Sequence, residues 1–486
     1  MMLSFLKRLL HPRRRMRYFK GQRITVAGLG AHGGAVGNIR WLHEQGAILT
    51  VTDIKTAAEL TQSLEALADL KDITWVLGEH RLSDFTDADM VVRNPALRRD
   101  NKFLTAARAA HVPVEMDSSL FFRYSPTKHV IGVTGSKGKT TTTHAIATLM
   151  NLRFAHVETI GVEGSSPLAA LPRLSADDLA VFELSSWRLE ALDEHKISPP
   201  TAIMVSLYRD HLNTYDSFDA YEETKKAIVK HQVVQDMALL NYDDPSVRAW
   251  NDGPLIQARV AWYTLGHKLP GDGIYVERGT IICKQGHYSG SVFSLSSLPT
   301  QSEHEQRNIL PAIYLAWLHK VRPEDMLRQL TNLPRLSHRM EPVGDTGDVT
   351  YINDSAATIP EATIAALNSF KNRPIVLILG GSDKELEFTN LANAVAKANI
   401  RALVFLPGNA TEYQLDHIKS AYGSPPPIHH VASMDEAVAK ATAEAQPRDI
   451  VLLSPAATSF GLFAHEFDRG DQFKRAVAQL TVAVPS

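Results

Sequence analysis

A glycine-rich segment that ends in lysine and threonine is the part of the sequence best suited to bind phosphate. It runs from Val130 to Thr141 and reads as a buried strand, a glycine loop and the start of a helix. Glycines let backbone N–H groups approach phosphate oxygens, Lys139 would neutralise their charge, and the Thr140 hydroxyl could ligate Mg²⁺. The loop is the short form Gly-x-x-Gly-Lys-Thr, because Val133 stands where the common P-loop begins with glycine. We predict an ATP site here in preference to a structural glycine turn.

A second glycine-rich turn, from Gly28 to Gly33, follows a short apolar strand, and Asp53 ends the next strand twenty residues further on. This spacing is typical of a nucleotide-binding βαβ unit, in which the turn approaches a diphosphate and the carboxylate takes a ribose or base edge. The motif indicates a nucleotide diphosphate but does not select NAD. A purely structural turn is the alternative.

Carboxylate and imidazole groups follow two more predicted strands. Glu183 lies in the segment Phe-Glu-Leu-Ser-Ser, and His211 in the segment Tyr-Arg-Asp-His. Mg²⁺ takes few protein ligands and keeps waters and phosphate oxygens, so Thr140, Glu183 and His211 form a reasonable set. From spacing alone, a structural role for each is an equal alternative.

The elements that must position these residues are those of parallel α/β sheets. Apolar, β-branched runs alternate with helical patterns, and we predict strands at 24–28, 48–53, 129–134, 179–183, 201–206, 375–379 and 450–453. The segments around 126 and 334 have the character of domain boundaries. Short strands with glycine-rich turns between Trp262 and Ser294 predict a β insertion in the middle domain.

Length and composition agree with a multidomain enzyme. The 486 residues suggest about three domains, and 44% hydrophobic with 21% charged residues is typical of a globular protein. A net charge of -2 gives no reason to expect nucleic acid. The single cysteine, Cys283, is compatible with a reducing compartment, and no apolar run is long enough to span a bilayer. We expect a cytoplasmic protein.

The first 23 residues are basic and contain no acid. Several leucines and a phenylalanine lie among the cations, so this segment could touch an anionic membrane surface. We favour the simpler interpretation, a solvated extension ahead of the first domain.

The order of motifs resembles that of the Mur ligases over nearly the whole chain. Besides the glycine loop and Glu-Leu-Ser-Ser, the shared motifs are the Asp-His pair, Tyr221-x-x-x-Lys225, His338-Arg339, Asn353-Asp354-Ser355, Gly380-Gly381-x-x-Lys384 and Ser454-Pro455-Ala456. Within the family, the chain is most similar to the glutamate-adding branch. The similarity lies in the Gly-Leu-Gly opening, in Phe-Glu-Leu-Ser-Ser, and in the ending Ser454 to Phe460 with Phe467-Asp468-Arg469-Gly470.

The resemblance implies three α/β domains: a Rossmann-like N-terminal domain, a P-loop-type ATP-binding central domain with a small β insertion, and a Rossmann-like C-terminal domain. We place them at 24–125, 126–333 and 334–486. It further implies an ATP-dependent ligase of peptidoglycan precursor synthesis, with two Mg²⁺ ions, that adds glutamate to UDP-N-acetylmuramoyl-L-alanine through an acyl phosphate. We expect D-glutamate and a monomer, with L-glutamate as the alternative.

The same resemblance assigns residues to each ligand. Those expected at ATP are Gly135, Ser136, Lys137, Gly138, Lys139, Thr140, Thr141, Asn308, Arg339 and Asp354. Those expected at the UDP-sugar are Gly30, Ala31, His32, Gly33, Asp53, Lys55, Ser185 and Arg188. Those expected at the amino acid are Thr358, Lys384, Ser459 and Phe460. The metal ligands are expected to be Thr140, Glu183, His211 and a carbamylated Lys225, and the catalytic residues Lys139, His211, Lys225 and Arg339.

Some positions depart from the family pattern. Residues 161–167 replace the usual Gly-Gly-Asn-Ile-Gly, Arg188 stands where glutamine is common, Glu305 replaces an asparagine and Ala356 replaces a lysine. Loss of a cation at 356 and gain of one at 188 would redistribute charge around the substrate carboxylates, or else record divergence, which we favour.

Three other functions compete with this interpretation. Another ligase of the superfamily would add a different amino acid or act on a folate-like acceptor. A Rossmann dehydrogenase leaves Lys139, Glu183 and His211 unexplained. A nucleotide-gated binding module would bind ATP without releasing phosphate. The sequence disfavours the last two.

Overall fold

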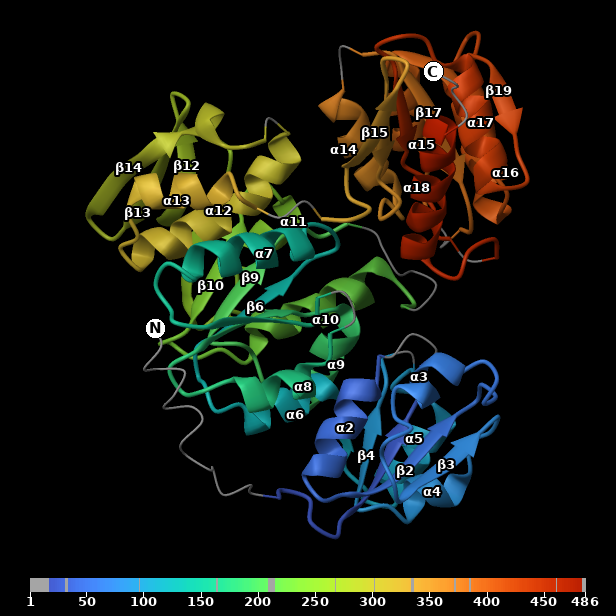
Figure 1. The fold of residues 1–486 in the computed structure, drawn as a ribbon. Helices are drawn as coiled ribbons and strands as arrows, with labels where there is room; N and C mark the ends of the chain where they lie inside the picture. The colour runs from blue at the N-terminus through green and yellow to red at the C-terminus, as the bar shows by residue number, and fades with distance from the viewer. Residues whose placement is uncertain are drawn as a thin grey trace.

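The structure is a computed structural model, and it describes residues 17–482 with short gaps. The residues outside the description are 1–16, 31–33, 96, 163–164, 209–214, 267, 301, 334–335, 371–372, 384–385, 460 and 483–486. Figure 1 shows three lobes in chain order: blue at the N-terminal side, green to yellow in the middle, and orange to red at the C-terminal side.

The first sheet forms from five short segments that pair in parallel, in the order β3-β2-β1-β4-β5. The strands are β1 (Arg23–Ala27), β2 (Ile48–Asp53), β3 (Ile73–Leu77), β4 (Met90–Arg93) and β5 (Val114–Glu115). The connecting helices are α2 (Val36–Glu44), α3 (Thr61–Glu65), α4 (Leu82–Thr86) and α5 (Lys102–Ala109), and α6 (Asp117–Tyr124) leads into the middle lobe. The strand order reverses at β1, so the turn after β1 opens where parallel sheets bind ligands.

The central sheet has nine strands in the order β14-β13-β12-β11-β10-β9-β6-β8-β7. Its strands are β6 (Val130–Thr134), β7 (Val157–Ile160), β8 (Leu179–Glu183), β9 (Thr201–Met204), β10 (Met237–Asn241), β11 (Arg259–Tyr263), β12 (Asp272–Glu277), β13 (Thr280–Gln285) and β14 (Tyr288–Ser294). Pairing is parallel from β7 to β12 and antiparallel from β12 to β14. The predicted β insertion is therefore a meander that extends this sheet.

Helices cover the central sheet and fix the position of the strand ends. They are α7 (Lys139–Met150), α8 (Pro167–Ala170), α9 (Ser186–Glu194), α10 (Phe218–Lys230), α11 (Pro245–Ala249), α12 (Glu303–Leu318) and α13 (Pro323–Leu330), with 3₁₀ turns η1 (Leu171–Arg173) and η2 (Leu295–Ser297). Every residue of β6 is buried, as its apolar sequence predicts. Apolar side chains of α7 and α12 share one core cluster with β6.

The C-terminal sheet has six strands in the order β15-β16-β20-β17-β18-β19, antiparallel at β15 and β16 and parallel elsewhere. The strands are β15 (Glu341–Thr346), β16 (Val349–Asn353), β17 (Ile375–Gly380), β18 (Ile400–Leu406), β19 (Ile428–His430) and β20 (Ile450–Leu453). The helices are α14 (Pro360–Ser369), α15 (Thr389–Lys397), α16 (Asn409–Ala421), α17 (Met434–Glu444) and α18 (Glu466–Val482). Asn353 pairs with Leu453, so Asp354 and Ser454 follow neighbouring strand ends.

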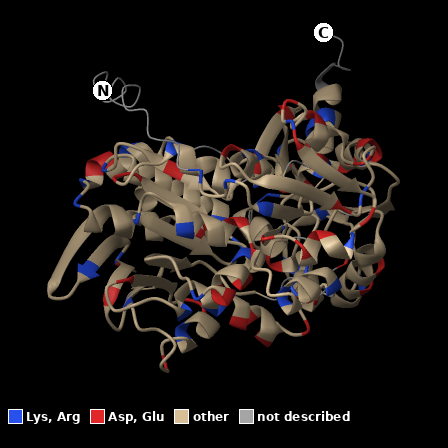
Figure 2. Ribbon diagram, turned by 90° about the horizontal axis from the view of Figure 1, so that it is seen from below, with Lys and Arg blue, Asp and Glu red and all other residues tan. Residues whose placement is uncertain are grey.

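The predicted three-part α/β fold is confirmed, and the seven predicted strands agree with the observed ones to within two residues at each end. The domain bounds near 126 and 334 stay predictions. Lys and Arg are interspersed with Asp and Glu along the ribbon (Figure 2). In the described part of the chain, no helix is both long and apolar enough to cross a membrane. The basic N-terminal segment, for which we favour a solvated extension over membrane contact, lies mostly outside the described residues.

Candidate active site

The glycine loop between β6 and α7 is shaped as an anion cradle. Gly138 has a φ of 86°, and a Cβ atom there would lie 2.5 Å from Asn308 Oδ1, so glycine is required by both the backbone and the space. Lys139 begins α7 and folds its ammonium group back over the loop, 3.0 Å from the Gly135 carbonyl oxygen and 3.2 Å from that of Ser136. A phosphate placed here would meet a helix N-terminus and a lysine together.

Two buried groups from other elements reach the same end of the sheet. Glu183 ends β8 beside Val133 of β6, and within the described residues its Oε2 atom is buried without a hydrogen-bond partner. Lys225 comes from α10, is 1% exposed, and donates to Thr134 Oγ1 at 3.0 Å and to the Gly135 carbonyl at 3.3 Å. An unpartnered carboxylate oxygen near the loop that carries Thr140 suits a divalent cation.

The structure describes three of the four residues that the sequence predicted as metal ligands. Thr140, Glu183 and Lys225 lie around the glycine loop, whereas His211 lies outside the described residues. Among the residues that the structure describes, no three His, Cys, Asp or Glu side chains gather as a metal cluster. The donors that are present, a hydroxyl and a carboxylate, fit Mg²⁺, which completes its shell with water and phosphate oxygens.

Side chains of the C-terminal lobe meet the glycine loop across the interlobe boundary. Lys137 Nζ donates to Thr358 Oγ1 at 3.0 Å, and Arg339 donates to Thr140 Oγ1 at 3.3 Å. Between them lies a cavity with about 620 Å³ of open space. Its lining includes Lys137, Gly138, Thr141, His304, Glu305, Asn308, Arg339, Asp354 and Ala356. Six of the residues predicted at ATP therefore line one cavity: Lys137, Gly138, Thr141, Asn308, Arg339 and Asp354.

The first turns of α12 supply a polar wall of this cavity. Asn308 is buried, and its Nδ2 atom lies 3.3 Å from Nδ1 of His304 one turn earlier. Burial lowers the pKa of His304 to about 4, so its imidazole is neutral at physiological pH and Nδ1 can accept the amide hydrogen. Sequence reasoning missed His304. Its position four residues before Asn308, on the same helix face, was the available signal.

Asp354 is buried at the end of β16, where it accepts hydrogen bonds from the Ser454 hydroxyl at 2.8 Å and the Met340 amide at 3.2 Å. Burial raises the pKa of its carboxyl to about 7. An unfolded aspartate ionises near pH 4, so between about pH 4 and 7 the folded chain keeps a proton that the unfolded chain has lost. The stability from this proton is complete below about pH 4 and is lost as the pH rises through 7.

Asp354→Asn should therefore flatten the pH dependence of stability. A shift of one pKa unit corresponds to about 1.4 kcal/mol. Between pH 4 and 7 the unfolding free energy of the parent should therefore fall by up to about 4 kcal/mol, and the variant should not show this fall. Urea unfolding of both proteins at several pH values measures the difference. Asp435→Asn, at an exposed position of α17, serves as the control. Equal pH slopes for parent and Asp354→Asn would contradict the prediction.

The turn after β1 is held by the acid at the end of β2. One carboxylate oxygen of Asp53 accepts the Leu29 amide at 2.9 Å and the Gly30 amide at 3.1 Å, and the other accepts the Lys55 amide at 2.9 Å. Asn94 packs against Gly28, whose φ is 96° and whose added Cβ would lie 2.7 Å from Asn94 Cβ. Asp53 thus orders the turn, and its predicted contact with the UDP-sugar stays a prediction. Ala31, His32 and Gly33 lie outside the described residues.

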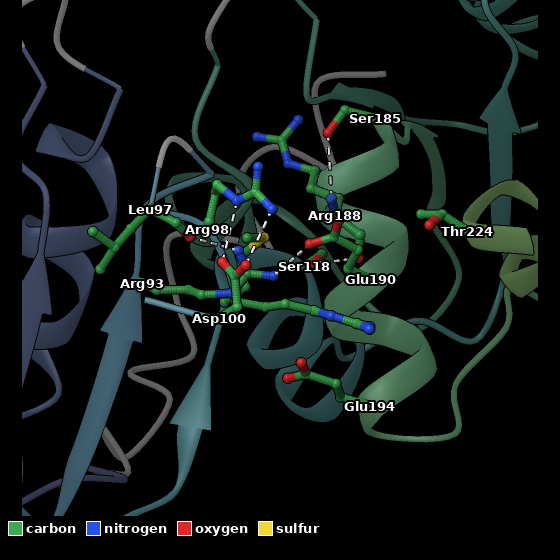
Figure 3. Close-up of polar contacts among 12 residues, drawn as sticks. Arg93, Leu97, Arg98, Asp100, Ser118, Ser185, Arg188, Glu190, Glu194 and Thr224 are labelled. Carbon is green, nitrogen blue, oxygen red and sulfur yellow. Dashed lines mark hydrogen bonds and ion pairs between the residues drawn. The ribbon is translucent and has the colours of Figure 1, made fainter. Parts of the chain in front are cut away.

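Arg188 lies in the first turn of α9 (Figure 3) and binds a carboxylate of α6, a helix that packs on α8 and α9 of the middle lobe. Its guanidinium donates to both oxygens of Asp117 at 3.3 and 3.0 Å and to the Gly161 carbonyl at 3.4 Å, and it lies 5.5 Å from the Phe182 ring centroid. Ser185 caps α9 by accepting the Arg188 amide at 3.3 Å. The cation gained at 188 is thus offset by a carboxylate 71 residues away.

The Arg188–Asp117 pair should show strong energetic coupling, because both side chains are largely buried, 13% and 4% exposed. Arg188→Gln or Asp117→Asn alone leaves a charge without its partner, which should cost roughly 3 kcal/mol of unfolding free energy. The double variant should cost less than the sum, with a coupling of roughly 1 to 3 kcal/mol by urea unfolding. Arg98 and Asp100, a nearby exposed ion pair in Figure 3, provide a matched double-mutant cycle as the control. Its coupling energy should be less than about 1 kcal/mol. Similar coupling in both cycles would contradict the prediction.

The residues predicted for the amino acid are placed in part. Thr358 faces Lys137, Ser459 is buried after the loop that follows β20, and Ala356 lines the cavity. Lys384 and Phe460 lie outside the described residues. The sequence placed Arg469 of α18 in a family motif but gave it no role. The residue is fully buried and donates to the Ser355 carbonyl at 2.8 Å and the Ala457 carbonyl at 3.1 Å. It thereby joins the two loops that follow β16 and β20.

Comparison with known proteins agrees with this layout. Three Mur ligase family profiles match consecutive parts of the chain: the MurD-like N-terminal domain at residues 22–115, the Mur ligase middle domain at 133–316, and the Mur ligase glutamate ligase domain at 338–457. A UDP-N-acetylmuramoylalanine–D-glutamate ligase of Roseiflexus sp. (strain RS-1) is 38% identical over 95% of this chain and 99% of its own length. The protein of that name from Borreliella afzelii (strain PKo) is 33% identical over 96% and 100%.

The chain belongs to the Mur ligase family. As a Mur ligase it is an ATP-dependent enzyme that joins an acid to an amino acid. Two solved structures share its fold. The Thermotoga maritima UDP-N-acetylmuramate–alanine ligase has a TM-score of 0.59 and 19% identity over 95% of this chain and 100% of that one. A pseudomurein peptide ligase type C of Methanothermus fervidus has a TM-score of 0.57 and 20% identity over the same shares. The three lobes of this Mur ligase therefore follow a known arrangement.

Proposed function

We propose that this Mur ligase adds D-glutamate to UDP-N-acetylmuramoyl-L-alanine in peptidoglycan precursor synthesis, with ATP as the energy source. The observation that carries the proposal is the meeting of the glycine loop with the C-terminal lobe, where Lys137 contacts Thr358 and Arg339 contacts Thr140. Relatives that are 38% and 33% identical over nearly the whole chain bear the name of this reaction.

The first step makes the acceptor carboxylate reactive. A carboxylate oxygen of the substrate attacks the γ-phosphorus of ATP, the bond to the β-phosphate oxygen breaks, and ADP and an acyl phosphate form. Lys139 and Arg339 neutralise the charge that spreads over the transferring group, an electrostatic effect in which one donor is worth roughly 3 to 4 kcal/mol of barrier. Asn308 and Asp354 hold the nucleoside part of ATP in the cavity.

The second step forms the amide. The amine of glutamate attacks the acyl carbon and a tetrahedral intermediate forms. The bond between the acyl carbon and the phosphate oxygen then breaks, phosphate leaves with the electron pair, and the nitrogen loses a proton to give the amide. Thr358, Lys384, Ser459 and Phe460 position the amino acid. The acyl phosphate must be shielded from water throughout, because hydrolysis would waste it. Contact between the C-terminal lobe and the glycine loop supplies that shield.

Two Mg²⁺ ions complete the proposed site. Thr140, Glu183 and His211 would hold them, together with a carbamylated Lys225, and they would offset phosphate charge when bound. The buried Oε2 atom of Glu183 and the buried ammonium of Lys225 beside the glycine loop support this assignment. Residues 24–125, 126–333 and 334–486 form the UDP-sugar, ATP and amino-acid domains, with Gly30, Asp53, Lys55, Ser185 and Arg188 on the side of the UDP-sugar. The enzyme acts as a cytoplasmic monomer.

Phosphate release tests this function. Purified protein is given ATP, Mg²⁺ and UDP-N-acetylmuramoyl-L-alanine, with D-glutamate, L-glutamate or no amino acid, and the product is identified by mass spectrometry. Phosphate release and a glutamyl product with D-glutamate support the proposal. A product with L-glutamate alone would show that the enzyme adds L-glutamate in place of D-glutamate. No product with either would indicate a different acceptor or amino acid for this ligase.

A further inference from the structure

A second cavity lies at the opposite end of the central sheet from the glycine loop. It has about 970 Å³ of open space. The first residues of the parallel strands β6, β8, β9, β10 and β11 line it, together with the end of α12 and the turn after α7. No residue assigned above to ATP, the UDP-sugar, the amino acid or Mg²⁺ lies in this lining.

The inner surface of this cavity is apolar and aromatic. Val130, Ile131, Leu179 and Leu315 are buried in its floor. Phe154 lies between two imidazoles, with ring centroids 5.7 Å from His129 and 5.6 Å from His319. Such a surface favours a planar ring as its occupant, because rings pack on one another through stacked and edge contacts.

The rim of the cavity is cationic. Lys128 and Arg259 are exposed there, and neither forms an ion pair with any residue that the structure describes. One nitrogen of the Arg259 guanidinium donates to the Gln235 carbonyl at 3.3 Å, which leaves its positive charge without a counter-charge. Asp236 is the one acid among the described lining residues, and its carboxylate accepts the Val233 amide at 2.8 Å. Burial lowers the pKa of His319, and the charges of Arg153 and His129 lower it further, as expected where positive charge accumulates.

The carbonyl groups at the end of α12 do not need the positive charge of the rim, because they are paired within the chain. The carbonyl oxygens of Leu315, Ala316 and Trp317 accept the amides of His319, Val321 and Lys320, at 3.1, 3.0 and 2.9 Å. A helix end whose carbonyls are paired within the chain needs little further compensation by cations. The carbonyl groups of α12 therefore do not use the charges of Lys128 and Arg259.

We propose that this cavity is a binding site for a small aromatic anion. Its ring would pack on Phe154 and the two imidazoles, and its phosphate or carboxylate group would face Lys128 and Arg259. An anion alone would lack the apolar contacts, and a neutral ring would leave the two positive charges without a counter-charge. The inference is independent of the proposed ligase reaction, because it uses none of the residues of that site.

Calorimetric titration of the full chain with four probes tests the proposal. Phenyl phosphate and benzoate carry both a ring and an anionic group, inorganic phosphate carries only the charge, and benzyl alcohol only the ring. We expect one of the first two to bind with a stoichiometry of one, at least tenfold more tightly than inorganic phosphate and benzyl alcohol. The stronger of the two identifies the anionic group.

Variants then locate the bound probe. Lys128→Ala with Arg259→Ala should weaken binding at least tenfold and leave ATP-dependent phosphate release unchanged, since both side chains are exposed. Lys419→Ala with Lys440→Ala, which removes the same charge from the C-terminal lobe, should bind like the parent. Binding that disappears in Lys139→Ala instead would place the probe at the glycine loop and overturn the proposal. Absence of binding, or equal binding of all four probes, would mean that the rim cations do not recognise an aromatic anion. Either result would also overturn the proposal.

Discussion

Lys139→Ala is expected to lower kcat for ATP-dependent phosphate release by roughly 10²- to 10³-fold, the loss typical for one donor aimed at developing charge. Lys139 is the first residue of α7, so its ammonium group and the helix N-terminus act on the same phosphate oxygens. The ammonium group donates to the Gly135 and Ser136 carbonyls, which keeps it over the loop. Alanine removes the charge and leaves the backbone cradle in place.

Steady-state kinetics and nucleotide binding separate the contributions of this lysine. A fall in kcat with a smaller change in the Kd of ADP would assign Lys139 to the transferring phosphoryl group. Lys440→Ala, at an exposed position of α17, is the control for loss of a charge. An unfolding free energy within about 1 kcal/mol of the parent would exclude misfolding, as expected for a side chain at a cavity. A decrease in kcat of less than threefold would contradict the assignment.

Arg469→Met is expected to give the largest loss of stability, roughly 2 to 4 kcal/mol. Methionine keeps most of the length of the side chain but none of its donors, so the Ser355 and Ala457 carbonyls would be buried without partners, at about 1 to 3 kcal/mol each. Part of this loss is offset, because a buried cation is itself costly. Burial lowers the pKa of the Arg469 guanidinium to about 10.

Urea unfolding monitored with probes in the C-terminal lobe measures this effect. Arg475→Met changes the same residue type one to two turns later on α18, at an exposed position, and should cost less than about 0.5 kcal/mol. Activity should fall as well, since Ser355 follows Asp354 directly and Ala457 lies two residues before Ser459. A stable Arg469→Met protein with full activity would show that other contacts hold these loops.

Periodic and local features were predictable from the sequence. The run Val130–Thr134 is apolar throughout and followed by glycines, so both the buried strand and the phosphate loop could be recognised from neighbouring residues. The short strands between Trp262 and Ser294 could be recognised for the same reason. What could not be predicted was their attachment to the central sheet, because strand pairing depends on residues far apart in the chain.

Partnerships between distant side chains were also beyond prediction. Arg188 could be recognised as an unusual cation, but its partner Asp117 is 71 positions earlier, and nothing in the spacing joins them. Asp53 was assigned to a ligand on its position after a strand, whereas the structure shows both its oxygens engaged with backbone amides. His304 is neutral because it is buried, and burial of one helix face at a lobe boundary is a property of the assembled chain.

The two hydrogen bonds that link the glycine loop to the C-terminal lobe also determine how firmly the two parts of the site are held together. A side-chain hydrogen bond of this kind contributes only about 1 kcal/mol net, so the links through Thr358 and Thr140 are individually weak. These two links alone therefore oppose separation of the loop from the lobe only weakly. A nucleotide that contacts both sides of the boundary would add interactions that favour the joined arrangement.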